Sequence, residues 1–208
     1  MSNGSQGMSI SKRLRPGRHQ LSRDEVRQHQ RERIFEALEV EMSTKGYGDT
    51  SVADIVKSAG VSRQTFYEQF DSKQACFLAS YERRQAAVVG AIFETPLTDT
   101  PLVRFASLLG TYLDVMARQP EISLLYLSGI NAAGPEAAAI RLKKQGQFVD
   151  GIAMVFDART EQQLFACRTL VAAISALVIN ALVDEDSQAV QNLHAPLVRV
   201  AARLMEVE

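Results

Sequence analysis

The sequence predicts an all-α fold of about nine helices, in which a group of short N-terminal helices is followed by a longer helical bundle. Ser or Thr residues of the kind that cap helix N-termini precede several segments in which apolar residues recur every three or four positions. No alternation of strand-like and helical segments occurs, so a sheet is not expected. One helix face that steps by three and four contains Leu102, Phe105, Leu109, Tyr112 and Met116.

The composition is typical of a soluble globular protein and excludes several classes of function. Of 208 residues, 46% are apolar and 23% are charged, and the net charge is −1. Two cysteines, Cys76 and Cys167, and three scattered histidines cannot supply a disulfide framework, a CxxC redox motif or a zinc site. The catalytic motifs G-x-S-x-G and H-E-x-x-H are absent. We therefore expect no catalytic residue, no metal, no cofactor and no enzymatic activity.

The two widely spaced cysteines and the lack of a targeting segment indicate a cytoplasmic protein, and the distribution of charge indicates one basic end. The N-terminus has no apolar targeting segment, and Thr169–Val183, the longest uncharged stretch of the C-terminal half, is shorter than the ~20 residues of a membrane span. We expect that stretch to be a buried helix and expect no membrane partner. Residues 11–33 carry eight basic and three acidic side chains, whereas residues 74–208 carry eleven basic and fourteen acidic ones. Such asymmetry is typical of a protein that meets a polyanion with one end only.

Three regions are expected along the chain. Residues 1–20 lack a periodic apolar face and are rich in Ser, Gly and Arg, which predicts a disordered basic tail. Residues 21–71 are expected to form a domain of short helices, and residues 72–208 a helical bundle.

Capping residues predict where the helices of the first domain begin and end. Ser22 and Glu25 form a capping box that starts the first helix, and the glycine of Lys45-Gly46 ends it. The following helices are expected to be capped by Thr50-Ser51, by Ser62 and by Asp71, with Gly60 ending the helix that starts at Ser51. Pro196 is expected to kink or delay the last helix.

The stretch from Val52 to Lys73 predicts a helix-turn-helix, in which two short helices are joined by a turn through Gly60. The second helix of this motif enters the major groove of DNA with its N-terminal residues on base edges. Arg can bond guanine, Gln can bond adenine, and a Thr methyl can contact thymine. Phe66 and Phe70 are expected to face inward. The expected base or phosphate contacts are Thr50, Ser51, Ser62, Arg63, Gln64, Thr65, Tyr67 and Lys73.

This stretch resembles the DNA-binding domain of the TetR family of bacterial transcriptional repressors. The resemblance covers about residues 30–80, and Val56 departs from it because such motifs commonly carry Ala there. It implies an all-helical dimer, a C-terminal effector-binding domain, and repression that a small molecule relieves. Residues 85–208 carry no motif that matches a known family. The matching pieces are Lys45–Val52, Ala59–Ser62, Thr65–Tyr67, Phe70 and Ser72-Lys73.

Two interpretations stay open for several of these residues. Arg63, Gln64 and Thr65 can form a DNA-reading surface or an ordinary solvated helix face. The tail arginines, among them Arg15 and Arg18, can be an arm in the minor groove or a solubilising run.

The expected effector is a small and largely apolar molecule held between the bundle helices. For each candidate contact the alternative is an ordinary core position. The candidates are Phe105, Leu109, Tyr112, Met116, Tyr126, Gln147, Phe148 and Asn180.

A homodimer is expected because residues 161–183 are apolar around the whole helix circumference. A single chain can cover only about half of that circumference, so a second copy is expected to cover the rest. This segment and the amphipathic helix at 187–207 predict a four-helix interface with a second copy. The expected interface residues include Ala173, Leu177, Asn180, Leu193 and Leu197. The rival interpretations are a DNA-binding protein without an effector and a helical small-molecule-binding protein or enzyme. The sequence does not distinguish repression from activation.

Overall fold

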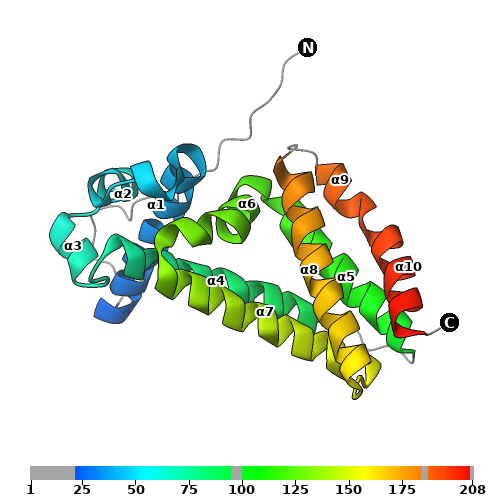
Figure 1. Cartoon of the computed structure of the whole chain (residues 1–208). Coiled ribbons are helices and arrows are strands. Elements are labelled where there is room, and N and C mark those ends of the chain that lie inside the picture. Colours follow the sequence, from blue (N-terminus) through cyan, green and yellow to red (C-terminus); the bar gives the residue numbers. More distant parts are fainter. Residues whose placement is uncertain (1–21, 95–99, 184–186, 207–208) are drawn as a thin grey trace, which may run out of the picture. The chain divides into compact units, whose positions relative to one another are not determined.

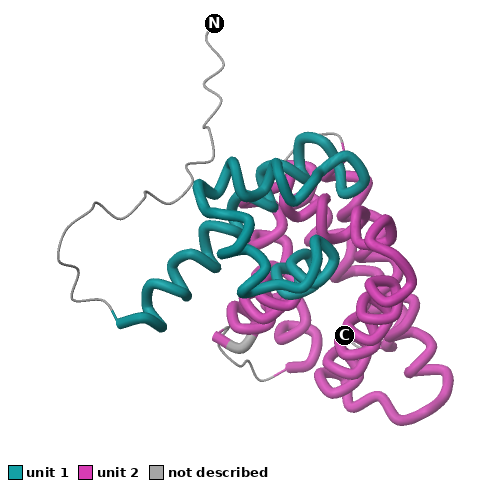
Figure 2. The backbone as a smooth tube through the Cα atoms, turned by 90° about the vertical axis from the view of Figure 1, so that its left-hand side faces the viewer, with its two compact units in different colours: residues 1–81 teal, residues 82–208 magenta. Residues whose placement is uncertain are grey.

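The computed structural model describes residues 22–94, 100–183 and 187–206, and helices joined by short connections make up these ranges (Figure 1). Within them lie ten α-helices and one 3₁₀-helix, and no strand. The chain divides into two compact units, residues 1–81 and residues 82–208 (Figure 2). The predicted tail at residues 1–20, with Arg15 and Arg18, lies outside the described residues.

The first unit contains α1 (Arg23–Asp49), α2 (Val52–Ala59), α3 (Arg63–Tyr67) and the start of α4 (Lys73–Phe93). The capping box predicted at the start of α1 is present, since the Ser22 amide donates to Glu25 Oε2 at 2.6 Å and the Glu25 amide donates to Ser22 Oγ at 3.2 Å. Gly46 does not end the helix outright. It has a left-handed φ of +79° that kinks α1, and helical turns continue to Asp49.

The start of α4 differs from the prediction. Ser72, and not Asp71, caps this helix, because Ser72 Oγ accepts a hydrogen bond from the Ala75 amide at 3.0 Å. The compact first unit also continues past Asp71 into α4. Phe77 packs edge-on against Tyr47 at 5.3 Å between ring centroids, and Ser80 Oγ donates to the buried carboxylate of Glu39 at 3.3 Å.

Aromatic side chains form the centre of the first unit. Phe66 of α3 is fully buried and lies 5.6 Å from the ring of Phe70, which in turn lies 5.4 Å from Phe35 of α1. The guanidinium of Arg31 covers the Phe70 ring at 4.4 Å. Both phenylalanines that were predicted to face inward therefore do so, and they attach α3 to α1.

The second unit contains the rest of α4, α5 (Pro101–Arg118), α6 (Pro120–Ser128), a 3₁₀-helix (Gly129–Ala133), α7 (Pro135–Phe156), α8 (Glu161–Val183), α9 (Ser187–Asn192) and α10 (His194–Met205). Proline opens α5, α6 and α7, where its missing amide leaves no hydrogen bond unmade. The predicted interruption near Pro196 appears as the break between α9 and α10.

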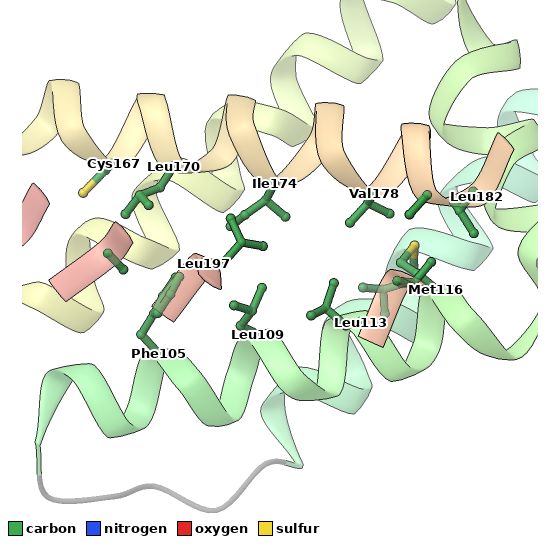
Figure 3. Close-up of a cluster of buried hydrophobic side chains, with 14 of the residues drawn as sticks. Phe105, Leu109, Leu113, Met116, Cys167, Leu170, Ile174, Val178, Leu182 and Leu197 are labelled. Carbon is green, nitrogen blue, oxygen red and sulfur yellow. The ribbon is translucent and has the colours of Figure 1, made fainter. Parts of the chain in front are cut away.

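The core of the second unit is built between α5 and α8. Phe105, Leu109, Leu113 and Met116 project from one face of α5 toward α8, which supplies Leu170, Ile174, Val178 and Leu182 (Figure 3). Leu197 of α10 lies between the two rows. The face of α5 that the sequence predicted is thus a core face.

We expect Leu113→Ala to lower the free energy of unfolding by about 2–5 kcal/mol, because it removes three buried carbon atoms and leaves a cavity. Leu113 is 1% exposed. Leu142→Ala is the matched control, since Leu142 of α7 is 63% exposed and should change stability by less than about 0.5 kcal/mol. Chemical denaturation of both variants checks this, and equal effects would contradict the assigned core.

Candidate DNA-binding site

The turn between α2 and α3 is fixed by a glycine and by a cation. Gly60 ends α2 in the left-handed region, with φ 62° and ψ 39°, where a side chain would be strained. Arg33 of α1, which is buried, donates through Nη2 to the carbonyls of Ala59 and Gly60. A cation at the carbonyl end of a helix is favourable. In the sequence Arg33 is only one member of a basic run, and no local signal predicts its contact with a turn 26 residues away.

The N-terminal residues of α3 present hydrogen-bonding groups at the surface. Ser62 Oγ caps the helix by accepting from the Thr65 amide at 2.9 Å. Arg63 and Gln64 are exposed, and the Gln64 amide donates to Glu68 Oε1 at 2.9 Å. Tyr67 is 54% exposed, and its ring stands edge-on to the buried Phe66. The candidate contacts of α3 therefore lie on the solvent side of a helix whose other side is held in the core.

Ser51 and Asp54 form a reciprocal cap at the start of α2. The Ser51 amide and hydroxyl both donate to Asp54 Oδ2, at 2.9 and 2.5 Å, and the Asp54 amide donates to Ser51 Oγ at 3.2 Å. Lys45 Nζ adds an ion pair to Asp54 at 3.2 Å. The hydrogen bonds from Ser51 hold the pKa of Asp54 well below its ordinary value of 3.8, with a smaller contribution from Lys45.

The prediction that Thr50 faces DNA is wrong for its side chain. Thr50 is 1% exposed, and its hydroxyl donates to the Gly46 carbonyl at 2.8 Å. Its hydroxyl therefore closes the last turn of α1 instead of reaching toward a phosphate.

The ammonium of Lys73 is directed at the end of α1. It donates to the carbonyls of Tyr47 at 2.7 Å and Thr50 at 2.8 Å, and it lies 3.5 Å from the carbonyl of Gly48. It also lies 4.3 Å from the centre of the Tyr47 ring. Burial lowers the pKa of Lys73, and the charge of Asp49 partly offsets this. The ammonium of Lys73, which was predicted to contact a phosphate, thus donates hydrogen bonds to carbonyls of its own chain.

This arrangement from α1 to α4 coincides with a known domain. Residues 34–80 match the family described as bacterial regulatory proteins, tetR family. The match covers 47 of the 208 residues, so it applies to this helix-turn-helix domain and not to the rest of the chain. YdgC of Bacillus subtilis, an uncharacterized HTH-type transcriptional regulator, is 43% identical over 47 residues, which are 23% of this chain and 24% of YdgC. The match thus spans about a quarter of that relative.

Solved structures resemble this chain over most of its length. A TetR transcription regulator from Haloarcula marismortui has a TM-score of 0.72 and 19% identity, covering 85% of this chain and 98% of its own. FadR from Bacillus subtilis, solved in complex with stearoyl-CoA, has a TM-score of 0.67 and 15% identity, covering 81% of this chain and 96% of its own. At such identities the likeness shows the fold alone, and it confirms the predicted all-α architecture.

The candidate effector residues divide into two groups by their burial. Phe105, Leu109, Met116 and Tyr126 are buried, and Tyr112 and Phe148 are partly buried with ring centroids 6.3 Å apart. By contrast, Gln147 and Asn180 are exposed on α7 and α8. The prediction that these two amides line the interior of the bundle is wrong for the single chain, because both lie on solvent-facing sides of their helices.

The candidate dimer residues also divide by exposure. Leu177 and Asn180 are exposed, and Ala173 and Leu193 are partly exposed. Leu197 is buried within its own chain, so it cannot lie at the surface of an interface as predicted.

Within the described ranges, α8 is the one helix long and apolar enough to cross a membrane, and 44% of its most apolar window is buried in the single chain.

We expect Asp54→Ala to lower the melting temperature at pH 7, because it removes the carboxylate that accepts hydrogen bonds from Ser51 in the reciprocal cap of α2. Since the folded pKa is depressed, the contribution of Asp54 is fully present above about pH 5 and is lost progressively as the pH falls below 3.8. The difference from the unmodified protein should therefore shrink in acid. Asp150→Ala, on the exposed face of α7, is the control and should show no such trend in thermal denaturation. A deficit independent of pH would contradict this role.

Proposed function

We propose that this protein is a cytoplasmic transcriptional regulator, in the first instance a repressor, that binds a palindromic operator as a dimer and is released by a small molecule. The observation that carries the proposal is the geometry of α3. A helix of five residues is anchored by a buried phenylalanine and presents Arg63 and Gln64 to solvent at its capped end. This is the arrangement that a helix-turn-helix needs to place side chains on base edges in the major groove.

The proposed contacts fall into two kinds. Arg63, Gln64 and Thr65 are assigned to base edges, because guanidinium, amide and methyl groups match guanine, adenine and thymine there. Ser51, Ser62 and Tyr67 are assigned to phosphates, since all three are exposed around the same motif. Gln64 would exchange its bond to Glu68 for one to a base, which keeps the cost of its release low.

The proposed dimer forms through the exposed sides of α8 and α10. Side chains exposed on α8 recur at steps of three and four, as expected for one continuous stripe. Alanines in this stripe permit close approach of a second helix. Obligate interfaces of this kind bury upward of ~2,000 Å². The exposed members of the stripe and of α10 include Phe165, Ala172, Ala176, Leu177, Asn180, Val183, Val200 and Leu204.

The proposed effector binds in the second unit and acts through α4. Tyr112 and Phe148 are partly buried beside the core row of Phe105, Leu109 and Met116, so they offer apolar contacts with one hydroxyl. The FadR neighbour was solved with an acyl-CoA, which supports a ligand with a long apolar part. Helix α4 runs from the first unit into the second. A ligand that favours the arrangement unable to bind DNA shifts the population by its differential affinity.

We expect Arg63→Ala and Gln64→Ala each to cost about 1–3 kcal/mol of operator binding and to relax base preference, while folding and dimerisation are unchanged. Arg118→Ala, at an exposed position of α5 outside the proposed interface, is the matched control and should bind as the unmodified protein does. Fluorescence anisotropy with operator and scrambled duplexes checks this. Full affinity with both α3 residues replaced would remove the basis of the proposal.

We expect Leu177→Arg to convert the dimer to a monomer, because an unpaired charge at the centre of an apolar interface costs several kcal/mol. Operator affinity should fall with it, since each half-site is then bound alone. Leu142→Arg is the control, because Leu142 is 63% exposed on α7, outside the proposed interface. Sedimentation at micromolar concentration measures both variants. A Leu177→Arg protein that still dimerises would exclude this interface.

A further inference from the structure

A pair of polar side chains is buried in the contact between α1 and α4. Glu39 of α1 is 1% exposed, Ser80 of α4 is fully buried, and Ser80 Oγ donates to Glu39 Oε1 at 3.3 Å. The two residues lie 41 positions apart in the sequence. Ser80 belongs to the last turn of α4 within the first unit, because that unit ends at Tyr81. The hydrogen bond therefore joins α1 to the far end of the part of α4 that belongs to the first unit.

Apolar side chains lie next to this pair along both helices. On α1, Phe35 and Met42 lie about one turn before and after Glu39, and both are buried. On α4, Phe77 lies one turn before Ser80 and is fully buried. Apolar side chains can pack in neighbouring registers, whereas a buried hydrogen bond between two given residues is made in one register. Since a buried polar group without a hydrogen bond costs free energy, this pair disfavours a slide of α4 along α1.

The register of α4 on α1 matters for DNA binding because both helices support the candidate site. Helix α1 holds α3 through the contact of Phe35 with Phe70, and it holds the turn before α3 through Arg33. The first turn of α4 carries Lys73, for which the sequence predicts a phosphate contact. A slide of α4 along α1 would therefore displace Lys73 relative to α3.

We propose that Glu39 and Ser80 are positioning residues for DNA binding, which fix the register of α4 on α1 and do not add to the stability of the fold. This inference rests on the proposed DNA-binding function. Replacement of both partners of a buried hydrogen bond by apolar groups of similar shape is nearly neutral or stabilising. Removal of the pair should therefore weaken operator binding without lowering the melting temperature.

The double variant Glu39→Met/Ser80→Ala tests this, because it replaces the pair with apolar side chains of similar size. We expect its melting temperature to equal or exceed that of the unmodified protein. Nuclear Overhauser contacts between the rings of Tyr47 and Phe77, which lie 5.3 Å apart, should be lost. Operator binding should be about tenfold weaker, as expected if about one molecule in ten keeps the competent register. Glu39→Gln, which keeps an acceptor for Ser80, and Glu82→Met, at an exposed position of α4, should retain the ring contacts and the affinity.

Three results would overturn the proposal. A double variant that melts at a lower temperature would mean that the pair holds the fold and does not select a register. The second result is a double variant with unchanged ring contacts and affinity, and the third is a Glu39→Gln protein that loses as much affinity as the double variant. The melting temperature and the ring contacts are measured without DNA. If the unmodified protein binds no operator, the proposed function fails, and these two measurements still decide whether the pair positions α4.

Discussion

The shortness of α3 is the constraint on which the candidate site depends. A helix of five residues has too few internal hydrogen bonds to be stable by itself, so its position must be imposed by its surroundings. Phe66 and Phe70 hold α3 in place, because they pack against one another and Phe70 packs against Phe35 of α1. The left-handed Gly60, the cap at Ser62 and the cation of Arg33 then fix the turn that precedes it. The exposed residues can vary without disturbing this support.

The two units are stabilised by different kinds of contact. The first must hold a few exposed polar groups in a fixed geometry, which explains its dense set of caps and aromatic contacts. The second relies on an apolar core between α5 and α8 (Figure 3). Helix α8 must serve that core on one side and, in our proposal, a second copy on the other. This double role accounts for an apolar helix that is only 44% buried in its most apolar window.

Local signals in the sequence were sufficient for the helices and for most of the motif. Capping residues such as Ser22, Ser51 and Ser62 act within three residues, so their partners can be identified from spacing alone. Long-range contacts had no such signal. Lys73 bonds carbonyls more than twenty residues away, and the enclosure of Leu197 by α5 and α8 depends on how the bundle closes. Periodicity also cannot tell which exposed stripe of α8 receives a partner.

The central claim is that two copies of this chain read DNA together through α3. Selection of duplexes from a randomised pool with the unmodified protein tests it most directly. The account predicts enrichment of an inverted repeat whose half-sites are centred about 34 Å apart, or a multiple of that spacing, on one face of the duplex. Enrichment of a single unrepeated motif, or no enrichment at low salt, would contradict it.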